Sequence, residues 1–257
     1  MSTTTIFHDL EGSSVFITGG GSGIGAALTD GFLAQGAKVA FVGRSDASRF
    51  CDEMAAKHNG NRPHFIKCDI TDIAALKASI NEAAERHGPI STLVNNAAND
   101  QRHSMAEVDE NFWNKMLDIN LKAYFFACQA VAPEMKKLGG GSIINFSSIS
   151  YMMGLAGMPL YTMANSAING LTRSLARELG PDHIRVNALA PGWVLTQKQK
   201  DMWVTKEALA AHLARQCLPE PLYPGDIVDP VLFLASNSSK MMSGQALVID
   251  GGVVVTG

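Results

Sequence analysis

Residues 14–25 have the sequence SVFITGGGSGIG, and this stretch decides the fold. Ser14–Thr18 is a short apolar run typical of a buried strand, and a helical pattern begins at Ile24. The glycines between them allow a tight turn and close backbone approach, and the helix N-terminus offers free N–H groups to a pyrophosphate. A glycine cluster alone is a weak signal, and a purely structural turn is the alternative. Its place between strand and helix favours a dinucleotide site.

The rest of the chain alternates short apolar runs with longer helical patterns. Further strands are predicted at Lys38–Val42, Phe65–Cys68, Ile90–Val94, Gly141–Phe146, Ile184–Leu189 and Ala246–Ile249. Helices are predicted at Ile24–Gln35, Ala47–Lys57, Ile73–His87, Asp109–Lys137, Tyr161–Leu179 and Pro224–Ala235. This alternation predicts a single-domain α/β fold of the Rossmann type over residues 1–257, a doubly wound, mostly parallel seven-stranded sheet with helices on both faces.

One region is irregular in this pattern, Trp193–Pro221, which is rich in Gln, Lys, Met and Trp. It follows the sixth predicted strand, at the side of the sheet where α/β proteins place their ligand crevice. We therefore expect a substrate loop at about residues 193–221.

The composition narrows the possible partners. Hydrophobic residues make up 46% of the 257 residues and charged residues 18%, which indicates a folded domain. The formal net charge of −3, without a block of like charges, gives no reason to expect nucleic acid or an anionic membrane as a partner. No signal peptide or membrane span is visible, so a soluble cytoplasmic protein is expected. The four cysteines and seven histidines show no metal-ligand spacing, and no metal is expected.

The choice between NADP and NAD rests on the end of the second predicted strand. An acidic residue there would accept hydrogen bonds from the adenosine ribose of NAD, but the chain has Gly43 followed by Arg44. A guanidinium can hold a 2′-phosphate in a forked geometry, which favours NADP and leaves NAD possible. The alternative is a solvated surface arginine, and Asp46 would weaken the argument if it turned inward. Asp69, at the end of the third strand, is placed to accept from the adenine amino group, beside Ile70.

Several further motifs occur in a fixed order along the chain. They are the glycine pattern at 18–25, Asn95-Asn96-Ala97-Ala98, Asn120, Ser148, Tyr161, Pro191-Gly192 and Asp250-Gly251-Gly252. Over nearly its whole length the chain thereby resembles the short-chain dehydrogenase/reductase family. Within it, the chain is most similar to bacterial aldose 1-dehydrogenases of the xylose and galactose type, on the stretches NNAANDQRH at 95–103, GSIINFSSIS at 141–150, Pro191-Gly192-Trp193 and Gln216-Cys217-Leu218.

The resemblance implies an activity and assigns its residues. A hydride would pass between C1 of an aldose and the nicotinamide, giving a lactone, while Tyr161 exchanges a proton with the substrate oxygen and Ser148 hydrogen-bonds it. Asn120 would hold a water that relays protons. The implied cofactor residues are Gly19, Gly21, Ser22, Gly23, Ile24, Arg44, Ser45, Asp69, Ile70, Asn96, Ala97, Ala98, Tyr161, Asn165, Pro191, Gly192, Val194 and Thr196.

The chain departs from the family at one catalytic position. The expected lysine lies four residues after the tyrosine, on the same helix face, and here that residue is Asn165. A free tyrosine titrates near pH 10. The positive charge of a nearby ammonium favours the phenolate, and a neutral amide does not supply that charge. We expect impaired proton transfer. Three explanations stay open: a substitution introduced to trap complexes, a natural low-activity variant, or a cation supplied from elsewhere in the fold.

Substrate and subunit contacts are also expected. The candidates to hold sugar hydroxyls after the fourth strand are Asn99, Asp100, Arg102 and His103, although a solvated loop is equally compatible with their sequence. Ser150 and Trp193 are further candidates, and Ser148 and Tyr161 complete this set. The resemblance implies a homotetramer whose interfaces use the helices at Asp109–Lys137 and Tyr161–Leu179. The alternatives are a ketone or secondary-alcohol reductase, and a catalytically silent protein that binds the cofactor.

Overall fold

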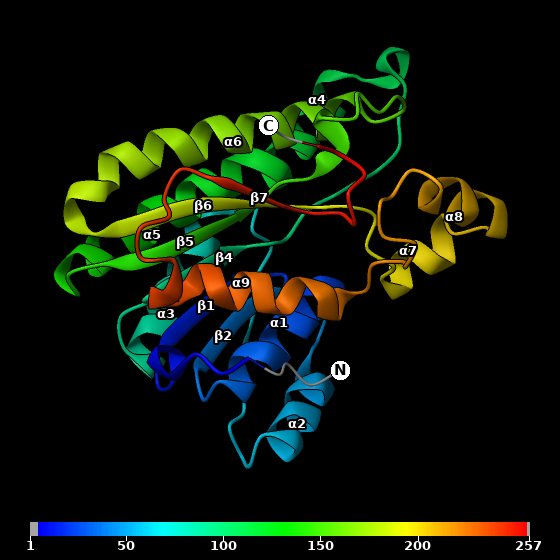
Figure 1. The fold of residues 1–257 in the computed structure, drawn as a ribbon. Coiled ribbons are helices and arrows are strands. Elements are labelled where there is room, and N and C mark those ends of the chain that lie inside the picture. The colour runs from blue at the N-terminus through cyan, green and yellow to red at the C-terminus, as the bar shows by residue number, and fades with distance from the viewer. Residues whose placement is uncertain (1–4, 256–257) are drawn as a thin grey trace.

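One sheet of seven parallel strands forms the centre of the computed structural model, which describes residues 5–255 (Figure 1). The strand order is β3-β2-β1-β4-β5-β6-β7. The strands are β1 (Ser14–Thr18), β2 (Lys38–Gly43), β3 (His64–Lys67), β4 (Thr92–Asn95), β5 (Gly141–Phe146), β6 (Ile184–Pro191) and β7 (Ala246–Ile249). The predicted single-domain α/β fold is confirmed. The order reverses between β1 and β4, which is the switch point where α/β sheets bind ligands beyond the carboxyl ends of their strands.

Helices cover both faces of this sheet (Figure 1). On one face, α1 (Gly23–Ala34), α2 (Ser48–Lys57) and α9 (Val228–Ala235) pack against alternate residues of β1 such as Val15. On the other, α3 (Ile73–His87), α5 (Ala123–Lys137) and α6 (Pro159–Leu179) contribute to a second core that includes Phe16. Because β1 is buried on both sides, its five residues are fully enclosed, and its carboxyl end is fixed rigidly beside the glycine turn.

The helix predicted over Asp109–Lys137 is wrong in its detail. It divides into α4 (Glu110–Leu117), a π-helical turn at Asp118–Lys122, and α5. A π turn inserts one residue and leaves the apolar periodicity on either side almost unchanged, so the sequence pattern did not reveal it. The turn carries the buried Asn120 toward the chain that follows β4.

The region predicted to be irregular, Trp193–Pro221, contains two short helices, α7 (Gln197–Met202) and α8 (Lys206–Leu213). The hydroxyls of Thr196 and Thr205 cap them by accepting from backbone N–H groups. Neither helix has a buried residue, so apolar burial does not fix their position. We call residues 193–215 the lid. Among the described residues no helix combines the length and apolarity that crossing a membrane requires.

Candidate active site

A cavity of about 1070 Å³ opens at the carboxyl ends of the strands. Its walls come from the glycine turn, the ends of β2, β3 and β4, the segment between β5 and α6, and the lid. Of the predicted cofactor residues, all line it: Gly19, Gly21, Ser22, Gly23, Ile24, Arg44, Ser45, Asp69, Ile70, Asn96, Ala97, Ala98, Tyr161, Asn165, Pro191, Gly192, Val194 and Thr196. The residues chosen for the cofactor therefore share one continuous wall.

The glycine turn leaves room that any side chain would fill. Gly19 has a φ of +74°, and a Cβ there would come within 3.1 Å of Ala97. A Cβ at Gly25 would collide with the Gly19 carbonyl oxygen. The side chain of Ser22 does not cap α1, so the free N–H groups of the first helical turn are available to an anion. This geometry fits the pyrophosphate of a dinucleotide.

Asn96 has a structural task at the floor of this turn. Its amide donates to the Thr18 carbonyl oxygen at 3.0 Å, and the Thr18 hydroxyl accepts from the backbone N–H groups of Asn96 and Ala97 at 2.9 and 3.1 Å. These bonds hold the ends of β1 and β4 together. The alanines that follow then bring their backbone to the cavity.

Charged residues lie where the ends of β2 and β3 reach the cavity. Arg44 lines the cavity, and within residues 5–255 no carboxylate lies within ion-pairing distance of it. Asp46 accepts from both the N–H and the hydroxyl of Ser48, and the hydroxyl bond leads in lowering the pKa of this carboxyl. Asp69 accepts from the backbone N–H of Thr71, which is the main cause of its lowered pKa, with a smaller effect from Arg44.

Ser148 and Tyr161 come together at the centre of the cavity. Ser148 follows β5, and its hydroxyl accepts from Ser150 N at 3.1 Å, which fixes the turn. Tyr161 lies in the first turn of α6, whose first residue is Pro159 rather than Tyr161 as predicted. Burial raises the pKa of the Tyr161 phenol, and its hydrogen bond with Ser148 opposes this shift in part. The phenol is therefore protonated at neutral pH.

Asn165 does not replace the missing ammonium. Its amide donates to the Tyr161 carbonyl oxygen at 2.9 Å, one helical turn back, and only 3% of the residue is exposed. A side-chain hydrogen bond from Asn165 lowers the pKa of Tyr161, but less than the Asp100 charge raises it. Arg102 is the cation that acts on the phenol, and its effect is smaller still. The net shift stays upward, away from the working pH of a general base.

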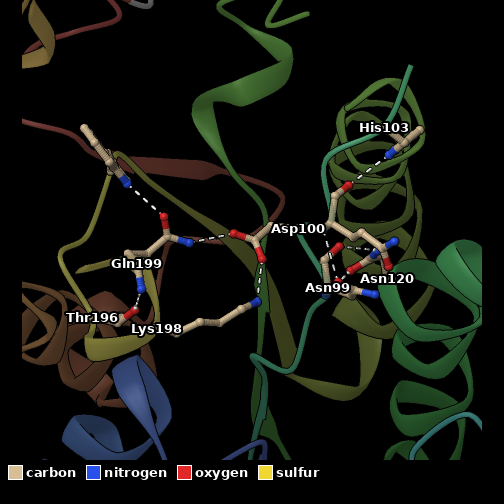
Figure 2. A network of polar contacts seen from close by, with 9 residues as sticks. Asn99, Asp100, His103, Asn120, Thr196, Lys198 and Gln199 are labelled. Atoms are coloured by element: carbon tan, nitrogen blue, oxygen red, sulfur yellow. Dashed lines mark hydrogen bonds and ion pairs between the residues drawn. The ribbon is translucent and has the colours of Figure 1, made fainter. Parts of the chain in front are cut away.

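Three residues expected near the chemistry do not line the cavity. The Asn120 side chain accepts from Asn99 N at 2.8 Å and donates to Asn99 O at 3.0 Å, so its amide is fully engaged with that backbone (Figure 2). The Asn99 side chain in turn accepts from Gln101 N at 3.1 Å. His103 is buried: one ring nitrogen contacts Gln101 O, and the other accepts from Leu160 N at 3.2 Å. These side chains shape the loop after β4, and the structure does not place Asn99 or His103 on the cavity wall, where sugar contacts were predicted.

The other predicted substrate residues, Arg102, Ser150 and Trp193, do line the cavity. Two neighbours from the lid, Trp203 and His212, also line it and were not predicted from the sequence. The Arg102 guanidinium lies 5.1 Å from the Trp203 ring centroid, and the Trp193 and His212 rings meet edge to face at 5.3 Å. Indole faces beside hydrogen-bonding groups suit a molecule with both apolar C–H and hydroxyl surfaces.

Two more residues of the site are Tyr124 and Asp100. Tyr124, in the first turn of α5, lines the cavity with a buried hydroxyl that has no hydrogen-bond partner within residues 5–255. Asp100 also lines it and joins the lid to the loop after β4. Tyr124 has no sequence signal, because it is a lone tyrosine in an apolar helix. Asp100 was among the predicted candidates after the fourth strand, but its link to the lid could not be predicted.

Comparison with known proteins agrees with the geometry. A family model described as enoyl-(acyl carrier protein) reductase matches residues 19–254. A probable galactose dehydrogenase from Rhizobium meliloti (strain 1021) is 49% identical over 249 residues, covering 96% of this chain and 97% of that protein. The chain belongs to the short-chain dehydrogenase/reductase family. Members of this family are oxidoreductases that use NAD or NADP.

Other short-chain dehydrogenase/reductase relatives extend the comparison. A D-xylose 1-dehydrogenase from Caulobacter vibrioides (strain NA1000 / CB15N) is 44% identical, covering 97% of this chain and 99% of its own. Among solved structures, a blue fluorescent protein from a metagenomic library, in complex with NADPH, has a TM-score of 0.87 and 34% identity, covering 96% of this chain and 99% of that chain. A putative short-chain alcohol dehydrogenase from Sinorhizobium meliloti 1021 has a TM-score of 0.89 at 28% identity, covering 95% and 96%.

Proposed function

We propose that this chain is an aldose 1-dehydrogenase that oxidises a pyranose at C1 to the lactone and prefers NADP as acceptor. The observation that carries the proposal is that Ser148 and Tyr161 line the same cavity as the glycine turn and the two indoles of Trp193 and Trp203. The two sugar dehydrogenases at 49% and 44% identity support the substrate class. Arg44, without a carboxylate partner among the described residues, supports NADP over NAD.

The residues divide the work of the reaction. When bound, the nicotinamide accepts the hydride that leaves C1. Tyr161, once deprotonated to the phenolate, would take the proton of the C1 hydroxyl, so that the C1–H and O–H bonds break as the lactone carbonyl forms. Ser148 donates a hydrogen bond to the same oxygen and holds it against the phenol. Arg102, Ser150 and Trp193 hold the remainder of the sugar.

The neutral Asn165 slows this reaction because Tyr161 must give up its own proton before it can act as a base. The same residue favours the second candidate, a protein that binds the cofactor without turnover. Reduction of a ketone or oxidation of another secondary alcohol is the alternative within the family.

Initial rates of NADPH and NADH formation with a panel of aldoses and simple secondary alcohols test the proposal. We expect turnover with an aldopyranose and NADP, and lactone as the product. Turnover confined to non-sugar alcohols would support the reductase alternative. Tight cofactor binding without turnover, in this chain and in the Asn165→Lys variant, would support the silent protein.

We further propose a homotetramer built on α4, α5 and α6. Each of these helices exposes a large apolar side chain: Trp113 on α4, Phe125 on α5 and Met163 on α6. Exposed apolar groups of this size are typical of subunit interfaces. Sedimentation velocity is expected to give the mass of four chains, and the Trp113→Glu/Phe125→Glu variant a smaller species. A monomeric parent would contradict this proposal.

A further inference from the structure

A polar network in the wall of the cavity joins two segments that lie almost 100 residues apart in the sequence (Figure 2). Asp100, in the loop after β4, accepts from Lys198 Nζ at 2.6 Å with one oxygen and from Gln199 Nε2 at 2.6 Å with the other. The Gln199 carbonyl oxygen accepts from the Trp193 indole N–H at 2.9 Å. One carboxylate is thus connected, through one amide, to the indole in the substrate wall.

The start of the lid is anchored by Val194 and Leu195, which are buried and pair with Leu222. The network matters because it fastens the helix that follows them. Helices α7 and α8 have no buried residue, so they contribute no apolar anchor. Arg102 reaches from the same loop to the Trp203 ring at the end of α7, and makes a second contact across the cavity. Charge-assisted hydrogen bonds are roughly twice as strong as neutral ones, and the side chain of Asp100 is only 21% exposed. The Asp100 contacts therefore form a strong link between α7 and the loop after β4.

We propose that Asp100 is a positioning residue that fastens α7 over the substrate half of the cavity and, through Gln199, sets the plane of the Trp193 indole. An indole fixed in this way presents one face to the substrate without losing further conformational entropy on binding. Without the carboxylate, α7 loses its link to the loop after β4, and Trp193 loses the orientation of its Gln199 partner. The kinetic test of this inference rests on the proposed function, and the hydrogen-exchange test does not.

Amide hydrogen exchange tests the attachment without any substrate. In Asp100→Ala we expect exchange of peptides within residues 196–205 to quicken about 10-fold or more, because two charge-assisted hydrogen bonds are lost, while peptides from β1 and β5 keep their rates. Asp201→Asn is the matched control: this carboxylate lies on α7 itself and pairs with Gln197 of the same helix at 2.7 Å. It removes the same charge without cutting the link, and we expect unchanged exchange.

Steady-state kinetics of the same protein provide the second readout. We expect kcat/KM for the aldose to fall about 10- to 100-fold in Asp100→Ala, mainly through KM, with little change in NADP affinity. Gln199→Leu leaves the Lys198–Asp100 ion pair in place and frees the Trp193 indole. It should therefore raise KM for the aldose, with a smaller change in hydrogen exchange than Asp100→Ala causes. A parent without aldose turnover would refute the proposed function, while the exchange experiment would still decide the role of Asp100.

Two results would overturn the inference. One is unchanged exchange over residues 196–205 in Asp100→Ala. The other is equal acceleration in Asp201→Asn, because charge on α7 rather than the link to Asp100 would then govern the lid. If Asp100→Ala does not fold, the double variant Lys198→Met/Gln199→Leu cuts the same bonds from the exposed helix, and the same pair of outcomes applies.

Discussion

Replacing Asn165 by lysine is expected to raise the rate of sugar oxidation. The side chain at 165 lies one helical turn from Tyr161 and lines the cavity, so a lysine can extend into the cavity beside the phenol rather than into the core. An ammonium within about 4–6 Å favours the charged form of a neighbouring acid by about 1–3 pKa units. The phenol of the parent, with its pKa raised by burial, is less than about 1% ionised at pH 8.

The size of the effect follows from the phenolate fraction. A shift of 1–2 units raises that fraction about 10- to 100-fold at pH 8, and kcat should rise in proportion where proton transfer limits the rate. The assay is NADPH formation at saturating NADP and aldose from pH 6 to 10. Asn165→Met is the matched control, because it has a comparable length without the charge, and it should not exceed the parent.

The pH profile separates this explanation from a general change in the site. In the parent, log kcat should climb through the whole range, because the deprotonated phenol becomes more abundant as the pH rises toward a raised pKa. In Asn165→Lys the curve should level off at a lower pH. A lysine variant with normal NADP affinity, the parental profile and no gain in kcat would refute the reasoning.

Four further outcomes are expected. Tyr161→Phe should lower kcat by about 100-fold or more with NADP affinity retained, because the proton acceptor is lost; retained turnover would contradict the assignment. Gly25→Ala should abolish NADP binding in calorimetry, since its Cβ would collide with Gly19 O. Arg44→Gln should raise the NADP dissociation constant about 10-fold or more and leave NAD almost unaffected, because one charge-assisted pair is lost; equal losses would argue against a 2′-phosphate contact. Burial depresses the pKa of His87 to about 4, so between about pH 6.5 and 4 the unfolded chain takes up a proton that the folded chain does not. Stability should therefore fall as the pH is lowered from about 6.5 to 4, and in His87→Gln the urea midpoint should fall less over this range.

The parts of the site that could be predicted from the sequence are those that local chain geometry dictates. The glycine turn needs particular residues at particular spacings because a strand must turn into a helix beside a phosphate. Tyr161 and the position at 165 lie four apart on one helix, so their proximity also follows from the sequence. The central strands such as β1 were recognisable because burial on both faces makes them continuously apolar, whereas the edge strands β3 and β7 are only partly buried and were found from their place in the alternation of strands and helices.

The residues that sequence reasoning misplaced depend on contacts between distant segments. The direction of His103 is set by Leu160 N, which lies 57 residues later in the chain, and the amide of Asn120 is turned to Asn99 by the π turn. Asp100 has its partners on α7, almost 100 residues away. The local sequence around each of these residues is compatible with a solvated loop, so only the fold could assign them.

Transfer of isotope from the sugar tests the central claim most directly. The measurement mixes excess protein with NADP and an aldopyranose that carries deuterium at C1, and mass spectrometry then follows the cofactor and the sugar product. We predict reduced cofactor that carries the deuterium, in amounts equal to the lactone formed, and no transfer with Tyr161→Phe. If no aldose in a broad panel gave labelled NADPH or NADH, in the parent or in Asn165→Lys, the assignment of an aldose 1-dehydrogenase would be contradicted.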